Sequence, residues 1–241
     1  MHINNAIIGH RGAAAYAPEN TLSAFDKARS LGCNCMEFDV MLSQDAEPFV
    51  FHDESLKRTT NGRGKFGLVG SEYLKTLDAG KWFAKDFAGE RILHFSEILH
   101  WLNDNGMQAN IEIKPFQDTA EQTTLVILEH IKALWLAGKP WPLLSSFSRE
   151  ALYLAKARAK ELPRALLMHS WDKDWLQLAS GLECYSIHVH YPKLNPKRVK
   201  AIKDRGYQLF AYTVNRKSQA DILYSWGVDA CFSDYPDLMS V

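Results

Sequence analysis

Two short acidic stretches carry residues of the types that bind metal ions. Glu37 and Asp39 are separated by a single residue in an apolar run, and Glu112 and Lys114 repeat that spacing about seventy residues later. Alternate side chains of a β-strand share a face, so each stretch projects its charged groups to one side. Three carboxylates that converge in a low-dielectric interior repel one another unless a cation lies among them. The stretches therefore indicate either a cation site or a set of solvated strand ends.

Two histidines and two basic residues accompany these carboxylates. His10 and His52 each end an apolar run, and imidazole titrates near neutral pH, so the pair can supply a general acid and a general base. Arg11 and Lys114 add positive charge, and the Arg side chain in particular matches the geometry of a phosphoryl group. A metal, two basic residues and two histidines together indicate cleavage of a phosphate ester.

Strands and helices alternate through most of the chain. Apolar runs predict strands at 6–10 and 35–40, with a helix near 21–28 between them. A third strand at 48–52 follows after about seven residues, too few for a parallel crossover, so it must form a hairpin that brings His52 beside Asp39. Six helix–strand pairs are then expected at 96–105 and 109–113, 118–136 and 142–146, 148–160 and 163–168, 172–180 and 184–189, 196–205 and 207–213, and 216–226 and 229–233.

Eight strands that alternate with helices predict an α/β fold, a closed (β/α)₈ TIM barrel that forms one domain over 1–241. The segment at about 54–93 lacks clear periodicity, apart from short helical pieces around 71–74 and 81–83, and is expected to be a small insertion after the hairpin. The active site of such a barrel lies at the carboxyl ends of its strands. Candidate residues at or near such ends are His10, Glu37, Asp39, Glu112, Lys114, Ser146, His169, His190, Thr213 and Asp234.

This coincidence favours a cation site over solvated strand ends. We therefore predict one divalent cation held by Glu37, Asp39 and Glu112. Carboxylate oxygens suit Mg²⁺, Ca²⁺ or Mn²⁺ better than zinc.

Composition narrows the range of partners and locations. Lys plus Arg equals Asp plus Glu at 28 each, which leaves no net charge to attract nucleic acid or an anionic membrane. The longest apolar runs are a few residues, so we expect no membrane span. The sequence begins without a basic and then apolar leader, which favours a cytoplasmic location. The four cysteines match no zinc spacing and are expected to be free and buried.

An ordered series of short motifs runs through the chain between residue 6 and about 238. The motifs are His10-Arg11-Gly12, Pro18-Glu19-Asn20-Thr21, Glu37-Phe38-Asp39, His52-Asp53, Arg58-Thr59-Thr60-Asn61-Gly62, Glu112-Ile113-Lys114, Ser146-Phe147, Thr213-Val214-Asn215 and Ser233-Asp234-Tyr235-Pro236. Each motif alone is weak, whereas the ordered set is highly specific. The set resembles the glycerophosphodiester phosphodiesterase family, and the start of the sequence without a leader makes it similar to the cytoplasmic bacterial members.

The resemblance implies the same barrel, with an insertion after the His-Asp motif. It assigns the divalent metal to the three carboxylates above, acid and base roles to His10 and His52, and phosphate contacts to Arg11 and Lys114. The sequence leaves open which histidine is the general acid. It also leaves open whether water attacks the phosphorus directly or the glycerol 2-hydroxyl attacks first. The implied reaction is metal-dependent hydrolysis of glycerophosphocholine, glycerophosphoethanolamine and similar diesters to sn-glycerol 3-phosphate and an alcohol, within glycerophospholipid degradation.

Several residues near the expected pocket need separate interpretation. Phe147 and Tyr212 are expected to contact the substrate, and Tyr212 stands where the family often has Trp, which could change the wall that contacts the alcohol. The sequence at 92–97 also departs from the family pattern, and is expected to affect only the start of a helix. His188 and His190 share a strand face and are expected to be structural or to line the pocket without a chemical role. Asp234 is expected only to hold the closing loop.

Two other functions compete with this one. A lysophospholipase D-type activity would use the same site on lysophospholipids, but it needs an exposed apolar surface for an acyl chain. A non-catalytic phosphate-binding barrel would be expected to lack a histidine or a carboxylate, and none is missing. For the enzyme we expect a small-molecule substrate and a monomer or homodimer.

Overall fold

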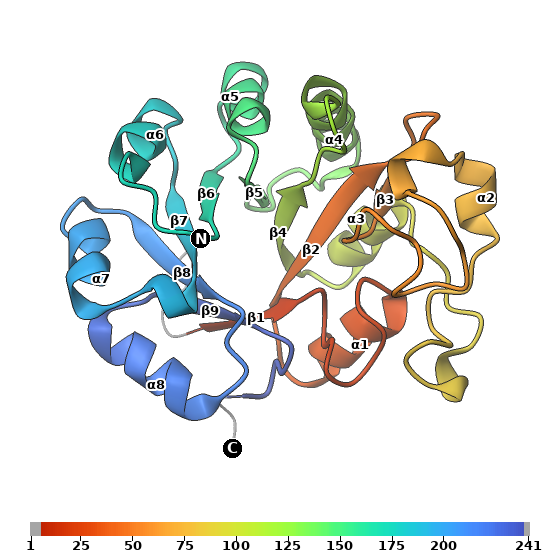
Figure 1. Ribbon diagram of the computed structural model, residues 1–241, viewed down its shortest axis with the longest axis horizontal. Helices are drawn as coiled ribbons and strands as arrows, with labels where there is room; N and C mark the ends of the chain where they lie inside the picture. The colour runs from red at the N-terminus through yellow and green to blue at the C-terminus, as the bar shows by residue number, and fades with distance from the viewer. Residues whose placement is uncertain (1–5, 239–241) are drawn as a thin grey trace.

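Parallel strands alternate with helices and close into a barrel in this computed structural model, which describes residues 6–238 (Figure 1). Eight parallel strands form the barrel, and β1 closes it by pairing with both β2 and β9. The predicted TIM barrel is confirmed. The strands are β1 (Ala6–His10), β2 (Cys35–Leu42), β4 (Gln108–Ile113), β5 (Leu143–Ser146), β6 (Arg164–Met168), β7 (Ser186–His190), β8 (Gln208–Tyr212) and β9 (Ala230–Ser233).

Helices surround the strands and bury their apolar faces against them (Figure 1). The largest fully buried side chains include Phe25, Phe38 and Phe95, which pack between the first helices and β2. The helices are α1 (Leu22–Ser30), α3 (Phe95–Asp104), α4 (Ala120–Leu134), α5 (Arg149–Arg158), α6 (Trp175–Gly181), α7 (Pro196–Lys203) and α8 (Lys217–Trp226).

Polar caps fix where several of these helices begin. The side chains of Thr21, Ser148 and Asn195 each accept a hydrogen bond from a backbone N–H in the first turn of α1, α5 and α7. His94 caps α3, and Glu97 accepts a hydrogen bond from the backbone N–H of His94 in return. The unusual sequence at 92–97 therefore sets the start of α3, as predicted.

The hairpin after β2 places the loop that carries His52. β3 (Pro48–Val50) runs antiparallel to β2, with Val50 opposite Val40. The predicted strand at 48–52 is two residues too long, because only the backbone N–H of Phe51 continues the pairing, to the carbonyl of Asp39. His52 lies just beyond, on the same side of the barrel as Asp39, as predicted.

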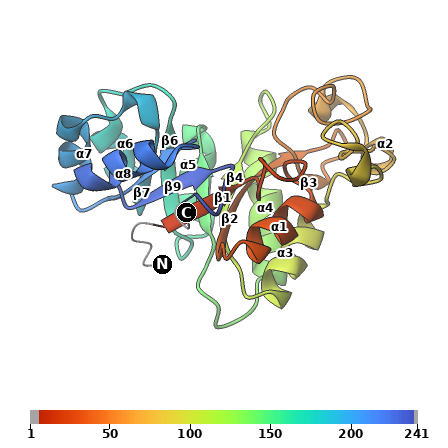
Figure 2. The same cartoon turned by 90° about the horizontal axis from the view of Figure 1, so that it is seen from below.

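The segment between β3 and α3 builds a small layer beside the barrel, which Figure 2 shows around α2 and β3. It contains short helices η1 (Phe66–Leu68), α2 (Ser71–Lys75) and η2 (Lys85–Phe87), and its apolar cluster includes Phe51, Phe66 and Leu74. The helical piece predicted at 81–83 is wrong. Residues 81–83 form a turn because the Asp78 carboxylate accepts hydrogen bonds from the backbone N–H groups of Gly80 and Lys81.

Within residues 6–238, no helix is long and apolar enough to cross a membrane. All four cysteines are buried and free, as predicted. Trp135 is buried and donates its indole N–H to the carbonyl of Pro140, so the residue that ends α4 packs against the loop that follows.

Candidate active site

A cavity of about 370 Å³ opens among the carboxyl ends of the barrel strands. Its charged part is contributed by β1, β2, β4 and the loop after β3. The residues lining that part are His10, Arg11, Glu37, Asp39, His52 and Glu112. The structure thus brings together the predicted histidines and the predicted metal ligands in a single cavity.

Glu37, Asp39 and Glu112 form a compact group of carboxylates. Each offers one oxygen, and these oxygens all lie within 4.8 Å of one another. The parallel register of β2 and β4 explains this, because Asp39 and Glu112 are directly opposite in the two strands. All three side chains are buried, with 5, 1 and 8 % of their surface exposed.

The three carboxylates differ in the charge that surrounds them. Burial opposes ionisation of Asp39, but Lys114 and Arg11 outweigh it and hold the pKa of that carboxyl well below its usual value. Burial, followed by repulsion from Asp39, raises the pKa of Glu112 to about 8. The same two causes raise the pKa of Glu37. Positive charge therefore compensates one carboxylate of the three.

The positive charge beside the cluster is directed at one of its three carboxylates. Arg11 Nε and Lys114 Nζ each lie 3.4 Å from an oxygen of Asp39, and the deficit falls on the two glutamates. Two buried glutamates beside an ionised aspartate offer hard oxygen donors, and both glutamates would become charged when a cation displaces their protons. The donor set therefore fits a divalent cation of the Mg²⁺, Ca²⁺ or Mn²⁺ type.

The raised carboxyl pKa values give a prediction for metal affinity. A cation must displace the protons that Glu37 and Glu112 retain, the latter up to about pH 8, so affinity should rise by up to about tenfold per pH unit for each displaced proton, and the contribution of Glu112 should level off above about pH 8. Calorimetric titration with Mn²⁺ at about pH 6, 7 and 8 measures this. The Glu112→Gln variant, which has no such proton, is the control and should bind weakly with a shallower pH dependence. An affinity of the wild-type protein that is flat across this range would contradict the prediction.

His10 and His52 each bind a carboxylate through Nδ1. The Nδ1 atom of His10 lies 2.6 Å from Asp234, and that of His52 lies 2.6 Å from Asp53. Asn215 in turn donates to Asp234 at 2.5 Å. Since Nδ1 is engaged in both rings, Nε2 is the nitrogen left to exchange a proton with a substrate.

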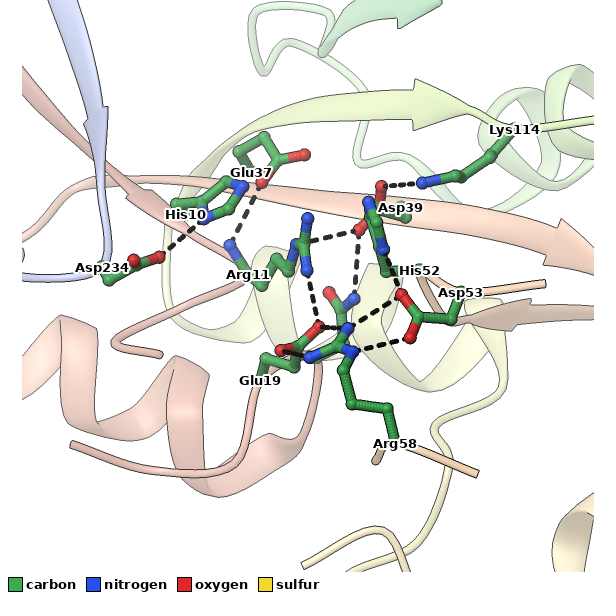
Figure 3. A network of polar contacts seen from close by, with 11 residues as sticks. His10, Arg11, Glu19, Glu37, Asp39, His52, Asp53, Arg58, Lys114 and Asp234 are labelled. Carbon is green, nitrogen blue, oxygen red and sulfur yellow. Dashed lines mark hydrogen bonds and ion pairs between the residues drawn. The ribbon is translucent and has the colours of Figure 1, made fainter. Parts of the chain in front are cut away.

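A chain of ion pairs connects the two ends of the site (Figure 3). Arg58, from the insertion, lies 2.6 Å from Asp53 and 2.5 Å from Glu19. Glu19 also accepts a hydrogen bond from Arg11 at 2.7 Å. The support of His52 and the orientation of Arg11 thus both depend on Arg58 and Glu19.

The His-Arg-Gly sequence is shaped to turn the chain sharply after β1. Arg11 has a φ of 53° and Gly12 a φ of 86°, and a Cβ atom on Gly12 would lie 2.7 Å from the backbone of Ala24. The turn directs the backbone N–H of Arg11 to Glu37 at 3.1 Å. It also places the guanidinium group over Asp39.

The remaining predicted residues lie as follows. Phe147 and Tyr212 line the cavity, with their rings 6.2 Å apart. Lys114 reaches Asp39 from the side and borders an adjacent hollow rather than the cavity itself. His188 and His190 both line the cavity.

Sequence reasoning missed several residues of the site. Asp53 and Arg58 were read only as parts of motifs, although Asp53 directly follows His52 and could have been expected beside it. Asp234 was expected only to hold the closing loop, yet it binds His10. No local pattern signals that contact, because the two residues are 224 positions apart.

Comparisons with known proteins agree with this geometry. The model of the glycerophosphoryl diester phosphodiesterase family matches residues 10–238. A glycerophosphodiester phosphodiesterase of Caldanaerobacter subterraneus is 34 % identical over 233 residues, which cover 97 % of this chain and 95 % of that protein.

Solved structures are similar over almost the whole chain. An Oleispira antarctica phosphodiesterase in complex with the product sn-glycerol-3-phosphate has a TM-score of 0.95 and 37 % identity, covering 98 % of this chain and 95 % of that one. A glycerophosphodiester phosphodiesterase from Agrobacterium tumefaciens has a TM-score of 0.80 and 28 % identity, covering 98 % of each chain.

Proposed function

The chain belongs to the glycerophosphoryl diester phosphodiesterase family, and we propose that its site hydrolyses glycerophosphodiesters to sn-glycerol 3-phosphate and a free alcohol. The observation that carries this proposal is the set of three buried carboxylates within 4.8 Å of one another, beside two histidines that are each bound to an aspartate. The product sn-glycerol-3-phosphate in the Oleispira antarctica structure supports the same reaction. Degradation of glycerophospholipids would supply such substrates.

A divalent cation belongs to this proposal as a cofactor. Glu37, Asp39 and Glu112 would hold it, because their oxygens converge and because burial and repulsion from Asp39 outweigh the attraction of the basic residues at both glutamates. When bound, a cation of the Mg²⁺, Ca²⁺ or Mn²⁺ type stabilises charge on the phosphoryl oxygens and lowers the pKa of an attacking hydroxyl or water.

The basic residues would orient the phosphodiester. Arg11 lines the cavity, and Glu19 and Asp39 hold its guanidinium group in place. We assign to it a contact with a non-bridging phosphate oxygen. Lys114 would contribute positive charge from beside Asp39, and Phe147 and Tyr212 would contact the organic part of the substrate.

The two histidines would exchange protons with the substrate. Burial lowers the pKa of His52 despite the attraction of Asp39, so the ring is neutral at neutral pH, as a general base must be. We therefore assign the base to His52 and the acid that protonates the departing alkoxide to His10. Asp53 and Asp234 would fix each ring so that Nε2 faces the reacting atoms.

Replacing an aspartate that binds a catalytic histidine tests whether it orients the histidine ring or contributes to substrate binding. Asp234→Asn keeps the shape but removes the negative charge that supports a protonated His10, so kcat should fall by at least about tenfold. KM should change far less, and the pH profile of kcat should change shape. Asp237→Asn, which alters only an exposed contact with Tyr16, is the matched control. Equal activity of the two variants would argue against an orienting role.

A panel assay tests the function itself. Glycerophosphocholine, glycerophosphoethanolamine, glycerophosphoglycerol and a lysophospholipid are each incubated with the protein, with and without excess chelator. We expect sn-glycerol 3-phosphate from the diesters, and its loss in chelator. Release of the head group from the lysophospholipid alone would favour the lysophospholipase D alternative. Absence of any product would favour a non-catalytic barrel.

We also propose a cytoplasmic location. All four cysteines are buried and free, which fits a reducing compartment.

A further inference from the structure

A single side chain of the insertion joins the two carboxylates that contact His52 and Arg11 (Figure 3). Arg58 donates from Nε and Nη2 to the two oxygens of Asp53, at 2.6 and 2.9 Å. It also donates from Nη1 and Nη2 to the two oxygens of Glu19, at 2.5 and 2.8 Å. One guanidinium group thus makes four hydrogen bonds to two carboxylates. Paired contacts of this kind fix the geometry of both partners as well as stabilising them.

Each of these carboxylates also contacts a residue that the proposed reaction uses. Asp53 lies 2.6 Å from Nδ1 of His52, and Glu19 accepts a hydrogen bond from Arg11 at 2.7 Å. Among residues 6–238, Arg58 and His52 are the only partners of the Asp53 carboxylate. Within the same residues, Arg58 and Arg11 are the only partners of the Glu19 carboxylate. Without Arg58, each carboxylate would be bound only to the group that it must orient.

The backbone around Arg58 is anchored independently of these contacts. Thr60 is buried, donates its hydroxyl to the carbonyl of Leu56 and accepts a hydrogen bond from the backbone N–H of Gly62. Leu56 is completely buried in the apolar cluster of the insertion. The Arg58 side chain itself is 44 % exposed. Replacing that side chain should therefore change its ion pairs while leaving the fold of the insertion intact.

Charge alternates along this set of contacts, from Arg11 through Glu19 and Arg58 to Asp53. Burial opposes ionisation of Asp53, but hydrogen bonds from Arg58 and His52 outweigh it and lower the pKa of that carboxyl to about 2. Burial also opposes ionisation of Glu19, but the hydrogen bond from Arg58 and the attraction of Arg11 lower its pKa. Both carboxylates are therefore ionised near neutral pH, and the contacts persist under the conditions in which the reaction is assayed.

We propose that Arg58 is a positioning residue that keeps the general base and the phosphate-binding arginine in their working orientations at the same time. This inference rests on the proposed hydrolysis of glycerophosphodiesters and on the roles given there to His52 and Arg11. A misoriented His52 ring slows proton transfer and lowers kcat, whereas a misoriented Arg11 weakens binding of the phosphodiester and raises KM. Arg58 is not among the described residues that line the cavity, so it acts through the other two.

Substitutions of Arg58 test the inference with glycerophosphocholine and with a p-nitrophenyl diester. In Arg58→Ala, kcat should fall by at least about tenfold with both substrates, because the base acts whichever leaving group departs, and KM should rise severalfold. Arg58→Lys keeps the charge but cannot make the four hydrogen bonds, so it should recover little of either loss. Arg63→Ala, at an exposed position of the same insertion, is the matched control and should leave both constants unchanged.

Double variants separate positioning from general damage to the fold. In the His52→Ala background, Arg58→Ala should lower kcat no further, because its effect on kcat passes through the His52 ring, whereas KM should still rise. In the Glu19→Gln background, Arg58→Ala should raise KM little further, because the link to Arg11 is already weakened. Damage to the fold would instead change both constants by the same factor in every background.

The opposite results overturn the inference in distinguishable ways. Wild-type values of both constants in Arg58→Ala would contradict it while leaving the proposed function intact. A change confined to one constant, a full recovery in Arg58→Lys, or an equal further loss of kcat in the His52→Ala background would contradict it in the same way. Failure of the wild-type protein to hydrolyse either diester would overturn the proposed function and the inference together.

Discussion

Replacing Glu112 by Gln is expected to reduce turnover by about 10³-fold or more without unfolding the barrel, and Glu37→Gln should behave in the same way. Both changes remove a proposed metal ligand, and a bound cation contributes several kcal/mol to the stabilisation of the transition state. Burial raises the pKa of Glu112 to about 8. The metal-free protein therefore already holds the neutral form that Gln imitates, and its fold should not suffer.

Three measurements distinguish this outcome from simple damage. They are kcat at saturating Mg²⁺ or Mn²⁺, calorimetric affinity for the metal, and the thermal midpoint of the metal-free protein. The midpoint of each variant should equal or exceed that of the metal-free wild type. Glu121→Gln, at an exposed position on α4, is the control and should keep full activity. Full activity of the wild-type protein in excess chelator would contradict a metal-dependent mechanism.

The histidines are expected to differ in their response to the leaving group. His10→Ala and His52→Ala should each slow hydrolysis of a natural diester by at least about 10²-fold. The p-nitrophenolate group of a p-nitrophenyl diester leaves without needing a proton. Loss of the general acid should therefore slow hydrolysis of that diester far less. On our assignment His10→Ala recovers much of its rate with that substrate, whereas His52→Ala is equally slow with both.

Metal binding provides the control for the histidine variants. Neither ring is proposed as a ligand, so both variants should bind the divalent cation with wild-type affinity. His100→Ala, at an exposed position on α3, should leave both rates unchanged. Recovery by His52→Ala instead of His10→Ala would reverse the assignment of acid and base. The two-histidine mechanism is wrong if both variants lose the metal, or if neither slows the natural substrate by about tenfold.

The barrel was predictable because each of its strands and helices is specified by the residues within that segment. The strands of the barrel are short apolar runs that alternate with helices of 3.6-residue period, and eight such strands leave a closed parallel sheet as the simplest way to bury them. Apolar periodicity placed the helix starts to within a few residues, and the structure shows side chains such as Thr21 and Ser148 capping them. The error at 81–83 arose where a single side chain, Asp78, decided the backbone conformation.

The site was only partly predictable, because some of its contacts join segments that are far apart in the sequence. Strand alternation places Glu37 and Asp39 on one face, and the barrel brings Glu112 beside them. The supporting contacts depend on side-chain reach between distant segments, as in the ion pair of Arg58 with Glu19. Periodicity carries no information about such pairs.

The contact between His10 and Asp234 joins residues 224 positions apart and has a consequence for folding. The first strand cannot complete its pairing until β9 has docked beside it, and contacts of such sequence separation form late because closing a long loop costs entropy. A chain that emerges from the ribosome amino end first therefore carries both histidines and all three carboxylates long before His10 acquires its partner. Hydrolytic activity should accordingly appear only with closure of the barrel, so that in refolding experiments the onset of turnover marks the arrival of the last strand.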